Sequence, residues 1–352
     1  MTGDCLMQNR KSKKYWNLLF LLAVFLLTLW SVFHGEDLGS VLRCLSLADP
    51  VFLIPAVVCV ILFILGESVI LHYLLGRLDT RVSFSHCCLY SFVGFFYSCV
   101  TPSASGGQPM QVLTMQKDRI PPAVSTVVLA IVTITYKLVL VLLGAAVLLL
   151  RPPQLILYLE PALAIIYLGM VLNVGFIALL LMLVFHPSMF RRLAQAVLRL
   201  LNLIRPLRNP ERQTERLERI VGQYEGTAAF YRANKHVMIH VFLITCLQRF
   251  ALFCVTWLTY RSFHLSGHGL AALVTLQGMI SVAADMMPLP GGMGVSENLF
   301  LDIFLPIFGE ALVLPGMVIS RGISYYTQLL ISAVMTAATA FLIKDNKKED
   351  PA

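Results

Sequence analysis

Six ionisable side chains lie within long apolar runs of the sequence, where charge is rare. They are Glu67, Lys137, Arg249, Asp285, Glu297 and Arg321. If these runs cross a bilayer, each charge costs about 2.5–3.5 kcal/mol at the centre of a lipid-facing helix, so each must face the protein interior and find a partner. That partner is either an internal counter-ion, such as Glu297 for Arg321, or a bound anion. Arginine suits a phosphate because its planar fork donates to two oxygens at once.

Two stretches rich in Pro and Gly interrupt the apolar runs in the same manner. Residues 101–109 read TPSASGGQP, and residues 288–297 read PLPGGMGVSE. Lys137 follows the pair Gly106–Gly107 at nearly the same distance as Arg321 follows Gly291–Gly292. We expect Gly291 and Gly292 to allow a positive φ or a close approach that larger residues resist. A single break of this kind could be only a kink, but two matched breaks with matched cations indicate a shared use.

The composition indicates a polytopic all-α membrane protein. Of the 352 residues, 58% are hydrophobic and only 13% are charged, and several apolar runs exceed the ~20 residues that a helix needs to cross a bilayer. The first run is too long for a signal-peptide core and no small-x-small cleavage site follows it, so we expect a retained helix. The predicted spans are 15–33, 50–75, 121–150, 159–185, 236–262 and 310–343.

Basic residues predict the orientation of these spans. If the N-terminus is cytoplasmic, most of the 27 Lys and Arg residues lie on its side, and only Arg43, Arg151 and Arg261 lie outside. This distribution satisfies the positive-inside rule and explains the net charge of +8. We therefore expect no nucleic-acid partner. The polar segment 187–235 would be a cytoplasmic amphipathic connector, which either contacts anionic headgroups or only links two spans.

The regions 84–116 and 268–309 are each too long for one span and are broken in the middle. For the charge pattern to hold, each must enter and leave on one side, as a re-entrant helical hairpin, and the two must insert from opposite faces. Such backbone is tolerated at membrane depth only inside protein or beside a wet cavity. We expect one transmembrane domain over 1–345, built as an inverted repeat of about 50–150 and 236–343, and a cytoplasmic tail at 346–352. Matched broken helices are the best sequence indicator of a transporter site.

The predicted substrate-binding residues lie at these breaks and in the spans beside them. Lys137 and Arg321 are the first choices because they occupy matching positions, and Tyr325 either donates to a headgroup or packs. The full set is Lys137, Arg321, Arg249, Glu297, Gln108, Gly106, Gly107, Gly291, Gly292, Gly294 and Tyr325. The eight cysteines show no CxxC spacing and no nucleotide or zinc motif occurs, so we expect no metal, cofactor or catalytic residue.

These motifs resemble one known family. TPSASGGQP, PLPGGMGVSE and the later RGISYY at 321–326 are similar to the lysylphosphatidylglycerol synthase transmembrane region, the flippase-like membrane domain of MprF-type proteins. The family pattern P-x-P-G-G-x-G-x-x-E matches Pro288, Pro290, Gly291, Gly292, Gly294 and Glu297. Arg321 and the pair Tyr325–Tyr326 match as well. The first motif departs from the pattern, because the family usually has an acid where Gln108 stands and often an Arg before an acidic position where Tyr136–Lys137 stands.

The resemblance implies movement of an anionic or aminoacylated phospholipid, such as lysylphosphatidylglycerol, between leaflets of the plasma membrane, which protects against cationic peptides. In full-length relatives a soluble domain is a phosphatidylglycerol lysyltransferase. This chain ends in KDNKKEDPA after the last span, so we do not expect it to catalyse that transfer alone. Two alternatives stay open: a transporter of another lipid-linked substrate, such as a polyprenyl-phosphate glycan, or a non-transporting partner of a separately encoded synthase. A homo-oligomer is also compatible with the sequence.

Overall fold

The computed structural model describes residues 46–185, 189, 191–192, 210–289 and 291–342. Every element in this part of the chain is helical, which confirms the all-α prediction. The predicted span at 15–33, residues 187–188, 190 and 193–209 of the connector, Pro290 and the tail at 346–352 lie outside the described residues.

Four segments are long and apolar enough to cross a membrane: α3 (Pro50–Arg77), α6 (Pro122–Leu150), the run Pro153–Val184 and α11 (Lys235–Ser262). They coincide with four of the predicted spans. The third comprises α7 (Pro153–Leu159), a 3-10 turn (Glu160–Ala162) and α8 (Leu163–Phe185). Prolines start three of these helices, where their fixed φ suits the first turn and their missing N–H costs nothing.

The predicted span at 310–343 is a helix with a local irregularity. It consists of α14 (Val313–Arg321), the π-helical segment η2 (Gly322–Thr327) and α15 (Gln328–Leu342). A π-helical turn inside an α-helix is rare and is frequent at functional sites. This one begins directly after Arg321 and contains Tyr325, so it sets the direction of two predicted site residues.

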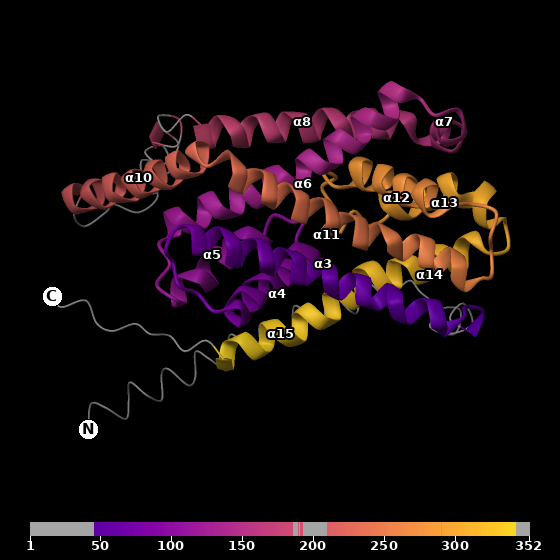
Figure 1. The fold of residues 1–352 in the computed structure, drawn as a ribbon, viewed down its shortest axis with the longest axis horizontal. Coiled ribbons are helices and arrows are strands. Elements are labelled where there is room, and N and C mark those ends of the chain that lie inside the picture. The colour runs from indigo at the N-terminus through magenta and orange to yellow at the C-terminus, as the bar shows by residue number, and fades with distance from the viewer. Residues whose placement is uncertain (1–45, 186–188, 190, 193–209, 290, 343–352) are drawn as a thin grey trace.

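Both Pro/Gly-rich regions are pairs of short helices separated by a break. The first is α4 (Phe84–Val100) followed by α5 (Gly107–Lys117), and the second is α12 (Leu270–Ala284) followed by α13 (Val295–Phe308). Figure 1 shows α4 and α5 toward the end of the bundle that holds α10 (Pro210–Ala233), and α12 and α13 toward the opposite end, beside α7. The two broken pairs therefore occupy opposite ends of the long axis.

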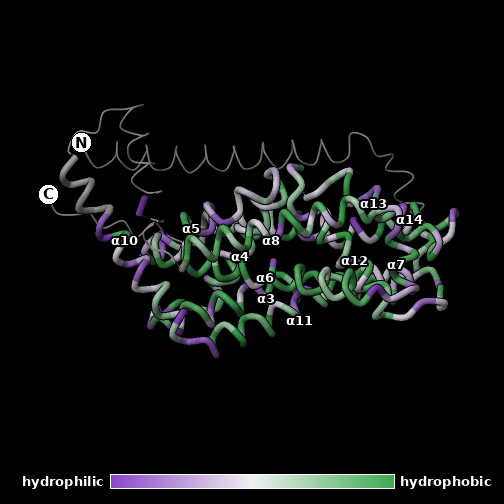
Figure 2. Tube along the Cα trace, turned by 90° about the horizontal axis from the view of Figure 1, so that it is seen from above, coloured by the Kyte–Doolittle hydropathy of each residue, from purple (hydrophilic) through white to green (hydrophobic). Residues whose placement is uncertain are grey.

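Hydrogen bonds tie neighbouring helix ends together at each end of the bundle. At one end, Tyr231 of α10 donates to the carbonyl oxygen of Leu74 (2.8 Å), near the last turn of α3. At the other end, the Asp49 N–H donates to the Ser262 carbonyl oxygen (2.8 Å), at the end of α11. Figure 2 shows hydrophobic residues along most of the helices and hydrophilic ones more often near the ends.

The helices pack in a reciprocal pattern across the two halves of the chain. α3 and α11 pack along each other at the centre, where Gln248 Nε2 donates to the Phe63 carbonyl oxygen (2.8 Å). α4 contacts α15, while α12 contacts α6. Each first half-helix thus packs on the last span of the other half. Large apolar side chains remain exposed on the outer faces of α3, α8 and α11, including Ile54, Val171 and Leu247, as expected where lipid is the neighbour.

Candidate substrate site

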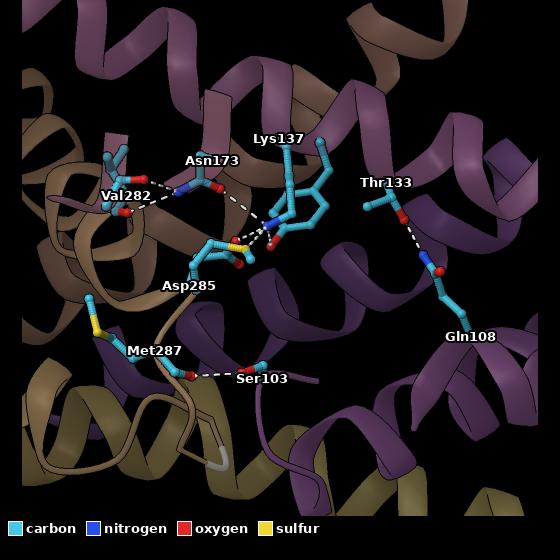
Figure 3. A network of polar contacts seen from close by, with 11 residues as sticks. Ser103, Gln108, Thr133, Lys137, Asn173, Val282, Asp285 and Met287 are labelled. Carbon is cyan, nitrogen blue, oxygen red and sulfur yellow. Dashed lines mark hydrogen bonds and ion pairs between the residues drawn. The ribbon is translucent and has the colours of Figure 1, made fainter. Parts of the chain in front are cut away.

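The two breaks meet each other, although they are far apart in the sequence. Ser103 in the first break donates its hydroxyl to the carbonyl oxygen of Met287 in the second (3.1 Å), as Figure 3 shows. In the first break, Ser103 and Ala104 adopt positive φ angles of 50° and 54°, which non-glycine residues seldom do. This polar contact between two irregular segments brings the two breaks together at one location in the fold.

The glycines of the second break behave as predicted. Gly291, Gly292 and Gly294 have φ angles of +57°, +66° and +80°, a region that glycine enters without steric cost. A Cβ on Gly291 would also overlap the ring of Tyr325. In the first break Gly106 has an ordinary φ of −81°. Gly107 is instead required by close packing, because its Cβ would stand 2.7 Å from the Gly94 carbonyl oxygen.

Lys137 lies near the middle of α6, and its ammonium group is paired with other side chains of the protein. Its ammonium forms an ion pair with Asp285, at the C-terminal end of α12, and donates to Asn173 Oδ1 (3.1 Å). Asn173 in turn donates to the Val282 carbonyl oxygen (3.1 Å), so α8, α6 and α12 are tied together. The cation also lies at the carbonyl end of α12, where the helix dipole favours it.

Arg321 pairs with Glu297, the internal counter-ion that the sequence left as an alternative. Arg321 Nε donates to Glu297 Oε1 (2.9 Å), and its Nη2 donates to the Gly291 carbonyl oxygen (3.1 Å). Glu297 lies in the first turn of α13, where the helix dipole stabilises a carboxylate. Arg321 therefore fixes both the start of α13 and the backbone of the break before it.

The contacts match positions of the two halves differently from the equal spacing of Lys137 and Arg321 after their glycine pairs. Gln108, at the start of α5, donates to Thr133 on α6 just as Glu297, at the start of α13, accepts from Arg321. One turn further along α6, Lys137 reaches the end of α12.

In the second half, the residue one turn beyond Arg321 likewise contacts the end of a half-helix from the other half of the chain. Tyr325 reaches the end of α4, where its hydroxyl donates to the Cys99 carbonyl oxygen (2.8 Å). By partners, Arg321 corresponds to Thr133, and Lys137 corresponds to Tyr325. This pairing by partners differs by one helical turn from the equivalence of the two cations, which stays a prediction.

Arg249 belongs to a neighbouring polar group on α3, α5, α6 and α11. Its guanidinium carbon lies 4.0 Å from the centroid of the Tyr136 ring, and Lys137 Nζ lies 5.0 Å from the same centroid. Glu67 is near enough to attract Arg249 and accepts a hydrogen bond from Gln111 Nε2 (2.6 Å). Lys137 and Arg249 thus share one region with four residues outside the predicted set: Glu67, Gln111, Asn173 and Asp285. Charge within an apolar run did single out Glu67 and Asp285, whereas a lone amide gave little signal.

Within the described part of the chain, no group of three His, Cys, Asp or Glu side chains could hold a metal ion. The site is instead a set of opposite charges and donors inside an apolar bundle, beside the broken half-helices. Such a set can hold a group that carries both charge and hydrogen-bonding atoms.

An all-helical bundle with apolar outer faces, four described helices long and apolar enough to span a membrane, and charges inside it indicates a membrane protein. The model of the family described as "Lysylphosphatidylglycerol synthase TM region" matches residues 18–332. The chain belongs to this family, as its motifs predicted. No curated protein matches the sequence.

Proposed function

We propose that this protein moves an anionic or aminoacylated phospholipid of the lysylphosphatidylglycerol type between membrane leaflets. The observation that carries the proposal is the meeting of the two broken helix pairs, from opposite ends of the bundle, through Ser103 and Met287. Family membership supports the same lipid class. A headgroup crossing the hydrocarbon needs polar partners along its route, and the charged cluster beside the breaks supplies them.

The proposed architecture is an inverted repeat with two re-entrant hairpins. The reciprocal packing of α4 on α15 and of α12 on α6 supports it. Transport would follow from rocking one repeat against the other about the shared centre. The orientation follows from the basic residues: plasma membrane, with both termini and the α10 end cytoplasmic. No chemical step on the lipid is part of this proposal.

The proposed function can be tested in sealed vesicles that contain the purified chain and a trace of headgroup-labelled phosphatidylglycerol. A membrane-impermeant reagent destroys the label in the outer leaflet only, so movement appears as loss of the protected inner half. We expect loss in vesicles with protein and a stable protected half in empty ones. A labelled lysylphosphatidylglycerol and a polyprenyl phosphate, each assayed alone, define the substrate class. Equal protection with and without protein for all three lipids would refute lipid transport and favour a non-transporting partner.

A further inference from the structure

Arg249 differs from the other buried cations in how it is held. Its guanidinium carbon lies 4.0 Å from the centroid of Tyr136 and 5.0 Å from that of Phe63. Aromatic faces attract a cation but accept none of its N–H groups in the strong, directed manner of a carboxylate. The rings therefore fix the position of the guanidinium while leaving its donor fork available.

The donors of Arg249 lack the acceptors that the other two cations have. Its Nε is buried and has no hydrogen-bond partner among the described residues. Lys137 has Asp285 and Asn173, and Arg321 has Glu297 and the Gly291 carbonyl, but no described carboxylate lies within 4.0 Å of Arg249. A buried polar group without a partner calls for a specific explanation, such as a ligand.

The groups around Arg249 favour an anion in that place. Lys137 Nζ lies 5.0 Å from the centroid of the same Tyr136 ring, so two cations share one aromatic side chain and repel each other. Glu67 attracts Arg249 from a distance, but its Oε1 is held by Gln111 on α5 (2.6 Å). A mobile anion can approach the fork more closely than this tethered carboxylate.

We propose that Arg249 binds a phosphate group, which its guanidinium fork holds over Tyr136 and Phe63. The Glu67 carboxylate competes with this phosphate for the guanidinium. A phosphate presents two oxygens to the planar fork. The inference rests on the proposed function for the source of that phosphate, which is the phosphodiester of a lipid. It assigns the contact to Arg249, and it makes Lys137 and Arg321 positioning residues of the two breaks.

Binding of phosphatidylglycerol to the purified full chain in neutral detergent tests the proposed phosphate site at Arg249. Losing a charge-assisted bidentate contact should raise the Kd about tenfold or more in Arg249→Gln, and Arg249→Lys should recover part of the loss. Arg261→Gln is the matched control on the same helix, because Arg261 already donates to the Leu265 carbonyl oxygen (3.1 Å). Diacylglycerol, which lacks the phosphate, should show no difference between Arg249→Gln and the unaltered chain.

Glu67→Gln provides a test that does not depend on removing the cation. The new amide oxygen can still accept from Gln111, so the local geometry is kept while the competing charge is lost. We expect the Kd for phosphatidylglycerol to fall about threefold or more, because the Glu67 carboxylate no longer repels the phosphate or attracts the guanidinium. If Glu67 only stabilises Arg249, the same change should leave the Kd unchanged or raise it. That result would overturn the proposal even if Arg249→Gln proves unstable.

Inorganic phosphate distinguishes the two sources of the group. If it displaces phosphatidylglycerol from the unaltered chain and from the Arg261→Gln control alike, but not from Arg249→Lys, the fork selects phosphate itself. If only the lipid binds, and does so through Arg249, the fork selects a lipid phosphodiester. If a folded Arg249→Gln variant binds phosphatidylglycerol as tightly as the unaltered chain, the proposal that Arg249 binds the phosphate is rejected. The vesicle assay measures movement and this assay measures binding. The phosphate-site proposal can therefore be rejected while lipid transport is retained, and lipid transport can be rejected while the phosphate site is retained.

Discussion

Arg321→Gln should lower the free energy of unfolding by about 3–5 kcal/mol and abolish lipid movement. That range is typical of removing one partner from a buried ion pair, because the other charge is left uncompensated. Here the residue left behind is Glu297, whose Oε1 accepts from Arg321 Nε at 2.9 Å. The Gly291 carbonyl oxygen loses its donor as well. Thermal unfolding of the purified protein and the vesicle assay measure the two effects.

A double variant separates the charge balance from the geometry of the break. Adding Glu297→Gln to Arg321→Gln removes both charges, so most of the lost stability should return. Lipid movement should not return, since the backbone at Gly291 stays without its guanidinium partner. Arg321→Lys should recover stability only in part, because an ammonium cannot reproduce both contacts of the fork. A double variant that moves lipid at the normal rate would show that transport needs neither charge.

Lys137→Met should have a comparable effect by a different route. The change leaves Asp285 without its cation and Asn173 Oδ1 without its donor, and it unties α6 from the end of α12. We expect a loss of about 3–5 kcal/mol in unfolding free energy, together with loss of transport. Lys235→Met is the control, because Lys235 is exposed at the start of α11 and surface substitutions usually change stability by about 0.5 kcal/mol or less.

Asp285→Asn added to Lys137→Met identifies the cause of the loss. With no charge left in the pair, the protein should regain stability, and Asn173 should still hold the Val282 carbonyl oxygen. Failure of this double variant to regain stability would mean that Lys137 acts through packing rather than through its pair with Asp285.

Hydropathy and turn chemistry predicted most of the helices of the described region and both breaks, but not α7 or the π-helical segment Gly322–Thr327. The long apolar runs could form only spans, and Pro288 with the glycines after it could not continue α12. The positive φ of Gly291 and Gly292 followed from the same residues. These features are local, since each depends on residues close together in the chain.

The partners of the charged residues could not be predicted in the same way. A charge in an apolar run must face inward, but neither the rotation of its helix nor the depth of its neighbour is encoded nearby. Lys137 finds Asp285 in the other half of the chain, and Tyr325 reaches Cys99. Counting residues from the glycine pairs therefore matched Lys137 with Arg321, whereas the contacts match it with Tyr325. Asn173, one amide in an apolar helix, became visible only through its contacts with Lys137 and Val282.

The central claim is that the two breaks form one site that is reached from both sides of the membrane. Its most direct test is the reactivity of a single cysteine at Ser105, an exposed position in the first break, in a chain without native cysteines. A small, membrane-impermeant thiol reagent is added to sealed vesicles of uniform orientation, either outside or trapped inside. We predict labelling of Ser105→Cys from each side, and none at the lipid-facing control Val171→Cys. Labelling of Ser105→Cys from one side only, in folded protein, would contradict the account.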